Sequence, residues 1–423
     1  MKVLVAVMPI AGHVAPVTGP VAELIGRGHA VQVYTGSRYS QRFADLGAEV
    51  STWSPGIDFN DDDLADAAEG RFGAVRSTRL VKKLFLETGT GQVQDLTRLL
   101  DRAPADVVVA DILSIGAGLI SEVRGLPWAG LGLLAYNSTS REQPPPGFRV
   151  APARGRLGRV RDRALWVAYR GVTSPFQRAY NTVRTDLGLP RDPELYGVSL
   201  LSPWLMIATG GPTLQQSPTA PTDQVHFVGR LAPAKSADYG PPPSRPAGRP
   251  RVLVTQGTHN RNPADLLQPA LLGLANLELE VIATTGRRGV TDVGIEVPAN
   301  ARVVDFLDFG ATLVDTAILV TNGGWGGVLE GLSAGVPLVV AGGDIDKPEN
   351  AARVARSGAG IDLRTGHPRP AAIAKAIVQL LDDPSYARRA GELGAELDQL
   401  GGAATAADLI EELNRTRATV RRA

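Results

Sequence analysis

The sequence predicts an α/β protein made of two Rossmann-like, doubly wound domains. A chain of 423 residues is too long for a single comfortable hydrophobic core, so two domains are expected. Short apolar runs of strand length alternate with segments in which apolar residues recur at helical spacing. A stretch rich in proline, glycine and alanine separates two series of this kind. Each series predicts a parallel sheet with helices between its strands.

The first forty residues set the pattern of the N-terminal series. Residues 3–7 (VLVAV) have the length of a buried strand, Val17, Val21 and Leu24 follow at helical spacing, and residues 30–35 (AVQVYT) form the next strand. A strand, a helix and a strand in this order are parallel. Further elements are predicted as strands at 106–111 and 127–132 and mostly helix over 39–101, with an acidic loop of solvated charge at 58–63.

The second series begins after a linker at 230–250, which has almost no apolar periodicity and the composition of a semi-extended chain. The linker divides the chain into an N-terminal domain (1–229) and a C-terminal domain (251–423). Strand-length runs restart after it with VLVT and continue through VIAT, RVV, ILVT and LVV. We expect the last helix, at about 403–423, to pack back on the N-terminal domain.

Composition narrows the class of partner. The formal net charge is +1, from 44 basic and 43 acidic residues, so no overall field favours nucleic acid, an anionic membrane surface or an acidic polymer. The partner is therefore expected to be a small molecule. The sequence contains no cysteine, which excludes disulfides and thiol nucleophiles, and it has neither a signal peptide pattern nor an apolar run long enough to span a membrane. We expect a cytoplasmic monomer or homodimer.

Two polar residues lie just beyond the carboxyl ends of strands, where open parallel sheets bind ligands. His13 follows the first strand, and Asp111 ends the strand at 106–111. A carboxylate that holds the Nδ1–H of a histidine leaves Nε2 free to accept a proton, so the pair is a candidate base with its orienting group. The alternative is a helix-capping histidine and a solvated aspartate. The other histidines are either structural in our interpretation (His29, His226, His367) or ambiguous (His259).

A glycine-rich loop lies between a predicted strand and a predicted helix, with glycines at 323, 324, 326 and 327. These glycines let the backbone approach a phosphate closely, and the helix N-terminus offers free N–H groups and the positive end of the helix dipole. A diphosphate would be held there without a metal, and Glu330 would accept hydrogen bonds from ribose hydroxyls. The alternative is a turn that only lets strand and helix pack.

A second loop places Asp346 and Lys347 after the strand VPLVV. One side chain accepts hydrogen bonds and the other donates them, which suits a polyol such as a sugar. Taken alone, the loop is better explained as a surface turn before a helix with Pro348 in its first turn.

These motifs together resemble the GT-B glycosyltransferases of the UDP-glycosyltransferase type, especially actinobacterial enzymes that decorate macrolides and other natural products. The resemblance covers essentially the whole chain. It rests on GHVAP (12–16), Asp111, TQGT (255–258), GGWGGVLEGLSAGVPLVV (323–340) and DKPENAARV (346–354). It implies two domains that face each other across a cleft, and an inverting, metal-independent transfer from a nucleoside-diphosphate sugar, which is a co-substrate and not a cofactor.

The resemblance also implies a role for individual residues. His13 is similar to the family's general base, which deprotonates an acceptor hydroxyl, and Asp111 to its partner. The implied donor-binding residues are Gly257 and Thr258 at the diphosphate, Phe306 and Leu307 at the base, Asn322, Gly323, Gly324, Trp325, Gly326 and Gly327 in the glycine-rich loop, Glu330 at the ribose, and Asp346 and Lys347 at the sugar. The acceptor, a largely apolar polyketide, macrolide or aromatic aglycone, is expected against Ile10, Gly12, Trp53, Phe59, Phe72, Phe85 and Tyr136, although core packing is the alternative for each aromatic residue.

The sequence departs from the family pattern at three of these positions. Asn322 stands where many relatives have a phosphate-binding histidine, and Gly327 where they have a serine or threonine. Asparagine still donates a hydrogen bond and backbone N–H groups can replace the hydroxyl, but a cation is lost. Lys347 replaces a glutamine, so the sequence leaves open which sugar is bound and whether the donor is UDP- or TDP-linked.

Three other functions are weighed against this interpretation. A NAD-dependent oxidoreductase would need G-x-G-x-x-G spacing and an acidic residue about 20 positions later; Asp344 is near that place, but GGWGG lacks the spacing. A nucleotide-sugar epimerase of the same fold would need a second acidic cluster in the cleft. A catalytically silent nucleotide-sugar-binding subunit would lack His13 or Asp111.

Overall fold

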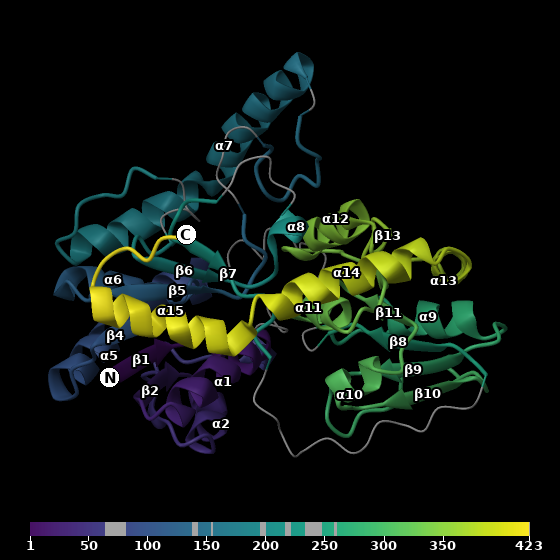
Figure 1. The fold of residues 1–423 in the computed structure, drawn as a ribbon, viewed down its shortest axis with the longest axis horizontal. Helices are drawn as coiled ribbons and strands as arrows, with labels where there is room; N and C mark the ends of the chain where they lie inside the picture. Colours follow the sequence, from purple (N-terminus) through teal and green to yellow (C-terminus); the bar gives the residue numbers. More distant parts are fainter. Residues whose placement is uncertain are drawn as a thin grey trace.

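The computed structural model describes residues 1–63, 82–137, 143–153, 155–194, 200–215, 221–232, 248–257 and 260–422. Within these ranges the chain forms two parallel β-sheets with helices packed around them (Figure 1). The first sheet has seven strands and the second has six. The predicted class, α/β with two doubly wound units, is confirmed.

The N-terminal sheet runs in the order β3-β2-β1-β4-β5-β6-β7. Its strands are β1 (Lys2–Ala6), β2 (Ala30–Thr35), β3 (Glu49–Thr52), β4 (Val107–Asp111), β5 (Trp128–Gly132), β6 (Leu205–Ala208) and β7 (Val225–Phe227). The chain moves outward in one direction from β1 to β3 and in the other from β4 to β7. The strand order therefore reverses between β1 and β4, and a crevice opens beyond their carboxyl ends.

The C-terminal sheet repeats this design in the order β10-β9-β8-β11-β12-β13. Its strands are β8 (Arg251–Thr255), β9 (Glu280–Thr284), β10 (Ala301–Val304), β11 (Ile318–Thr321), β12 (Leu338–Val340) and β13 (Gly360–Asp362). The reversal here falls between β8 and β11.

Helices connect the strands of both sheets. In the N-terminal half they are α1 (Ala11–Gly26), the short η1 (Ser37–Tyr39) and α2 (Ser40–Ala44), the π-helical η2 (Lys82–Glu87), α5 (Thr88–Arg102), α6 (Ile115–Arg124), α7 (Arg156–Asp186) and α8 (Pro212–Gln215). In the C-terminal half they are α9 (Leu267–Leu274), α10 (Phe309–Leu313), α11 (Trp325–Ser333), α12 (Lys347–Ser357), α13 (Pro370–Asp382), α14 (Ser385–Gln399) and α15 (Gly402–Thr416). Among the residues that the structure describes, none of these helices combines the length and the apolar character that a membrane crossing requires.

Helices cover both faces of each sheet, and successive residues of a strand point to opposite faces, so neighbouring residues of one strand belong to different apolar cores. In β1, Val3 and Val5 belong to the apolar core that includes α1 and α15, whereas Leu4 and Ala6 belong to the core on the other face, with α5 and α6. The continuous apolar run at 3–7 therefore predicted a strand correctly. Four shorter strands, β3, β6, β7 and β13, were not predicted, and β3 lies within the segment expected to be mostly helical.

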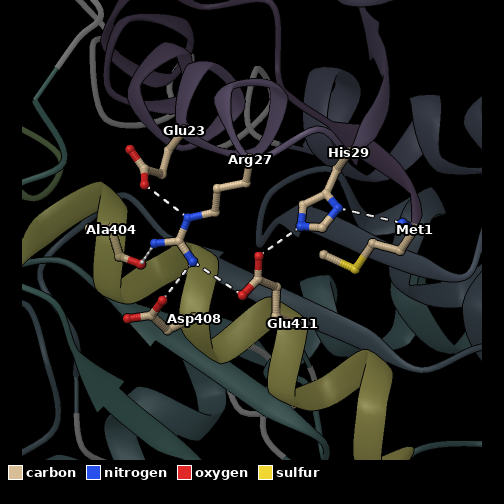
Figure 2. Close-up of polar contacts among 7 residues, drawn as sticks. All are labelled: Met1, Glu23, Arg27, His29, Ala404, Asp408 and Glu411. Atoms are coloured by element: carbon tan, nitrogen blue, oxygen red, sulfur yellow. Dashed lines mark hydrogen bonds and ion pairs between the residues drawn. The ribbon is translucent and has the colours of Figure 1, made fainter.

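The last helix, α15, follows the C-terminal domain in sequence but packs against α1 of the N-terminal domain (Figures 1 and 2). Figure 2 shows Arg27, at the end of α1, donating to Asp408 and Glu411 of α15, and His29 contacting Glu411 at 2.7 Å. The chain therefore passes between the domains twice. The two passages touch, because the amide of Gly402 donates to the carbonyl of Val228 at 2.8 Å.

Candidate functional site

A buried histidine and a buried aspartate meet at the carboxyl edge of the N-terminal sheet. His13 lies in the first turn of α1, directly after β1, and Asp111 is the last residue of β4. Because β1 and β4 are parallel neighbours, with Ala6 opposite Ala110, the two side chains emerge side by side. Nδ1 of His13 is 2.6 Å from Oδ2 of Asp111. The structure thus brings the predicted pair together.

Backbone amides fix the Asp111 carboxylate. Met8 N–H donates to Oδ2 at 3.3 Å and Leu113 N–H donates to Oδ1 at 3.1 Å. A carboxylate accepts hydrogen bonds and donates none. Nδ1 of His13 therefore carries the proton of the shared hydrogen bond, and Nε2 is left to accept another.

The electrostatic surroundings raise the pKa of His13 above its ordinary value of 6.5. Burial acts to lower this pKa, but the charge and hydrogen bond of Asp111 outweigh burial, and Asp346 and Asp61 add to the same effect. Asp346 belongs to the other domain. The histidine is therefore within the electrostatic range of a carboxylate across the cleft.

Asp61 was not recognised from the sequence, because it lies in the acidic loop expected to be solvated charge. In the structure its carboxylate accepts from the Ala11 amide at 3.0 Å and from the Tyr39 hydroxyl. Its neighbour Asp62 pairs with Arg38 of the same domain and with Arg261 of the other. Asp61 is thus partly buried and caps the start of α1, which the sequence did not indicate, whereas Asp62 is exposed as expected and forms ion pairs with both domains.

The glycine-rich loop follows β11 and enters α11. Gly323 has a left-handed backbone (φ 86°), and a Cβ at this position would lie 2.8 Å from a methyl group of Val340. Gly326, in the first turn of α11, is different: a Cβ there would meet no atom of the described residues within 4 Å outside its own helix. The space beside Gly326, next to the unpaired N–H groups of a helix N-terminus, is suited to an anionic ligand.

The Trp325 side chain does not share this position. Its indole is buried, donates from Nε1 to the hydroxyl of Thr209 at 3.1 Å, and lies against Gly210 of the N-terminal domain. The sequence placed Trp325 among the donor-binding residues. In the structure its side chain fills the domain interface, where its large apolar surface is buried, so a donor contact from this residue would come from its backbone.

Asn322 joins two loops of the C-terminal sheet. Its Nδ2 donates to the carbonyl of Gln256, and its side chain lies against Gly257, which has a left-handed backbone (φ 74°). Its Oδ1 accepts from the Gly324 amide at 3.3 Å. The residue that departs from the family pattern therefore ties the loop after β8 to the loop after β11. Thr258 lies outside the described residues.

The loop before α12 is tied to the glycine-rich loop in the same way. The buried Asn350 donates from Nδ2 to Asp346 Oδ2 at 2.8 Å and to the Gly323 carbonyl at 2.9 Å. Burial raises the pKa of Asp346, although Asn350 and the charge of His13 act to lower it. Lys347 is paired with Asp344 at 2.6 Å. The structure thus directs Asp346 toward the cleft and engages the Lys347 ammonium within its own loop.

The expected nucleotide positions line a neighbouring part of the same sheet edge. Glu330 accepts from Arg230, the first residue of the predicted linker, at 2.8 Å between Oε1 and Nη1. Phe306 and Leu307 follow β10 and are partly buried, with the Arg288 guanidinium 5.7 Å from the centre of the Phe306 ring. Arg230 and Arg288 had no sequence signal, because each is recognised only by a partner distant in the chain, and Asn350 was part of the motif at 346–354 without a role of its own.

Most of the predicted acceptor residues are core residues. Trp53 stacks on Tyr34 with ring centres 5.7 Å apart and meets Phe59 edge-on, and all three rings are buried. Tyr136 is buried against Phe227, and Ile10 belongs to the apolar core beside β1. Only Gly12 of the described group is exposed, and the Phe72 residue and the Phe85 side chain lie outside the described residues. The burial of Trp53, Phe59 and Tyr136 agrees with the alternative of core packing, because burying large rings stabilises the loops that carry them.

Comparison with known proteins identifies the family of this chain. The model of the erythromycin biosynthesis protein CIII-like C-terminal domain matches residues 269–411. The 4'-demethylrebeccamycin synthase of Lentzea aerocolonigenes is 35% identical over 421 residues, covering 97% of this chain and 99% of the relative. The chain belongs to the GT-B glycosyltransferases of the UDP-glycosyltransferase type.

Two further matches agree with GT-B membership. UDP-glucosyltransferase B1 of Starmerella bombicola is 28% identical over 410 residues, covering 92% of this chain and 93% of the relative. The crystal structure of the glycotransferase of kitacinnamycin has the same fold, with a TM-score of 0.75 and 24% identity over 97% of this chain and 98% of that one. The predicted GT-B fold and the glycosyltransferase class are confirmed, and neither the oxidoreductase nor the epimerase alternative receives support.

In this GT-B glycosyltransferase, a segment of the N-terminal domain reaches across to α12 and β13 of the C-terminal domain. Arg149 donates from its backbone to Glu349 at 3.1 Å and from its guanidinium to Asp362 at 2.5 Å. Arg353 of α12 donates to Asn137 at 2.7 Å. Asn137 and the loop at 143–153 are thus connected to α12 and β13 by hydrogen bonds in which one partner is charged.

Proposed function

We propose that the protein is an inverting glycosyltransferase that moves a hexose from a UDP- or TDP-linked donor to a hydroxyl of a small, largely apolar natural product. His13 is the general base and Asp111 orients it. The observation that carries the proposal is the 2.6 Å contact between these buried side chains at the edge that faces Asp346.

The proposed reaction is a single displacement. The acceptor hydroxyl gives its proton to Nε2 of His13 as its oxygen forms a bond with the anomeric carbon. The bond between that carbon and the diphosphate oxygen breaks, and the nucleoside diphosphate leaves with the electron pair. Asp111 stabilises the imidazolium that results. Attack opposite the leaving group inverts the anomeric centre.

On the donor side, charge grows on the diphosphate as this bond breaks. The N–H groups at the start of α11 and the open space at Gly326 support a diphosphate site that is organised before the reaction. Glu330 would receive the ribose hydroxyls and Asp346 the sugar hydroxyls, with Asn350 positioning Asp346. The relative named a UDP-glucosyltransferase supports a uridine-linked hexose, and the chain's own residues leave thymidine as the other choice.

The acceptor would lie beside the exposed Gly12, between His13 and the loops that contact α12. The relative named 4'-demethylrebeccamycin synthase supports a natural-product acceptor. The finer acceptor class, polyketide, macrolide or aromatic aglycone, is a matter for a substrate screen.

The test has two stages. First, thermal unfolding is followed with UDP, TDP, GDP or NAD in the absence of added metal; a rise with one pyrimidine diphosphate is expected. The matching α-linked glucose donor is then incubated with aromatic and macrolactone alcohols, and the anomeric configuration of the product is determined by NMR. A β-linked product that His13→Ala fails to form is expected. Stabilisation by NAD alone, or an α-linked product, would overturn the proposal.

A further inference from the structure

The outer half of α7 carries an exposed apolar stripe. Leu157, Val160, Val167 and Val172 are 88%, 61%, 72% and 67% exposed. The first three, with the exposed Ala164 between them, are spaced by three, four and three residues and so lie along one side of the helix. Figure 1 shows this part of α7 standing clear of the rest of the ribbon.

A basic stripe runs beside the apolar one. Arg156, Arg159 and Arg163 each precede an apolar stripe residue by one position, and Arg170 continues the line. All four are exposed, and within the part of the chain that the structure describes no carboxylate pairs with any of them. The one aspartate of this half, Asp162, is buried and pairs with Arg161. The overall charge of +1 therefore hides a local concentration of positive charge.

The third side of the helix is already covered. Trp166 is buried on this side and donates to the Gln143 carbonyl at 2.9 Å. The exposed Arg161, which lies one helical turn after Leu157, reaches the same loop and donates to the Ala151 carbonyl at 2.8 Å. The loop at 143–153 thus holds the inner side of α7, and the apolar and basic stripes face outward. The helix is fixed by its own side chains with these two stripes presented to the surroundings.

We propose that this face of α7, which we call the α7 face (Leu157, Val160, Val167, Val172 and the four arginines 156, 159, 163 and 170), docks on an anionic membrane surface. Guanidinium groups bind lipid phosphates through paired hydrogen bonds, and the adjacent apolar side chains enter the acyl boundary. A helix with one apolar and one basic side is the structure that lies in such an interface. The contact places a peripheral enzyme where apolar molecules partition.

The charge of the α7 face favours an anionic membrane over a second copy of the chain as its partner. A two-fold dimer buries the same patch on both subunits, which would bring two rows of arginines together without acidic partners. Anionic headgroups instead neutralise the row. A membrane is therefore favoured over self-association, and the docking does not depend on the donor or acceptor site.

The test measures co-sedimentation of the full chain with vesicles of phosphatidylcholine alone, or of phosphatidylcholine and phosphatidylglycerol in equal parts, without nucleotide. We expect binding only to the anionic vesicles and its loss at high salt. Arg159→Glu with Arg163→Glu should weaken binding by at least roughly tenfold, and Val160→Ser with Val167→Ser should also weaken it. The matched control, Val314→Ser with Arg302→Glu, changes an exposed valine and an exposed arginine of the other domain and should leave binding unchanged.

Thermal unfolding checks that each variant is folded, and light scattering measures its oligomeric state. All substituted side chains are exposed, so the unfolding midpoint of each variant should match that of the wild type. Equal binding to neutral and anionic vesicles, or equal loss in the control, would overturn the proposal. So would a wild-type dimer that the valine substitutions convert to a monomer while vesicle binding stays the same, since the α7 face would then be a protein interface.

Discussion

The two sheets of this glycosyltransferase have the same architecture but build their cleft edges from different parts of the chain. The N-terminal edge presents side chains: His13 and Asp111 are buried, paired and charged in a way that raises the histidine pKa. The C-terminal edge presents backbone, at Gly257, Gly323 and Gly326. The side chains of Asn322 and Asn350 hold these loops by hydrogen bonds to backbone carbonyls. In the proposed mechanism, proton transfer and donor binding therefore reside on different domains. Substitutions at the two edges should therefore affect different kinetic constants.

The largest effect is expected from His13→Ala. Loss of the base should lower kcat by about 10²- to 10⁴-fold, because general-base catalysis contributes that much. Affinity for UDP should change little, since the proposed diphosphate site lies on the other domain. Single-turnover rates and calorimetric titration with UDP measure the two quantities. A large loss of UDP affinity with an unchanged rate would break the proposed division.

Asp111→Asn tests the other member of the His13–Asp111 pair. Its loss of rate should be smaller than that of His13→Ala, because Nε2 remains. The Asp111 charge raises the pKa of His13, so in the wild type the rate should rise with pH through a value above 6.5 as the base loses its proton. In the variant, burial dominates and the His13 pKa falls. The rising limb of kcat/KM should therefore move to lower pH. An unchanged limb would show that the titrating group is not His13.

Gly326→Ala tests the backbone edge. The added methyl group enters the space assigned to the diphosphate, and overpacking of about 1 to 3 kcal/mol would weaken UDP binding by roughly tenfold. The same change should raise stability slightly, because alanine favours a helix over glycine by about 0.5 to 1 kcal/mol. Calorimetric titration and thermal unfolding follow the two effects.

Gly391→Ala is the matched control for this experiment. Gly391 lies in α14, and a Cβ there also meets no atom of the described residues within 4 Å outside its own helix. The control should gain stability and keep UDP affinity. Equal UDP affinity in both variants would contradict a diphosphate site at Gly326.

The smallest effect is expected from Arg230→Ala, which removes the partner of Glu330. Both side chains are partly exposed, so the ion pair itself contributes no more than about 1 kcal/mol. Without Arg230, Glu330 is less well oriented for the ribose, and UDP affinity should fall a few fold. Titration of the variant with UDP and with uridine-free pyrophosphate checks this. Loss of affinity for both ligands alike would place Arg230 at the phosphates instead of the ribose.

The sequence could predict those features whose signals are local. The runs at 3–7 and 252–255 predicted strands because strands that are buried on both faces are apolar at every position. His13 and Asp111 were found because each lies at or just after the carboxyl end of a strand. The strand β3 was missed because it has only four residues, none of which is buried. Asp61 and Arg230 contact partners 50 and 100 residues away, which no local pattern shows. For Trp53 and Phe59 the sequence left core packing and an acceptor wall as alternatives, because an aromatic residue has the same appearance in both, and the structure buries both rings.

The position of α15 has a consequence for the order in which the protein is completed. The apolar core that contains Val3, Val17 and Val21 also contains Leu409, Ile410 and Leu413. During synthesis, the N-terminal domain emerges first, but this face stays uncovered until the whole C-terminal domain has been made. The contacts that close it span almost the full chain, and such contacts form slowly. The domain that holds His13 is thus the first to begin folding and the last to be finished.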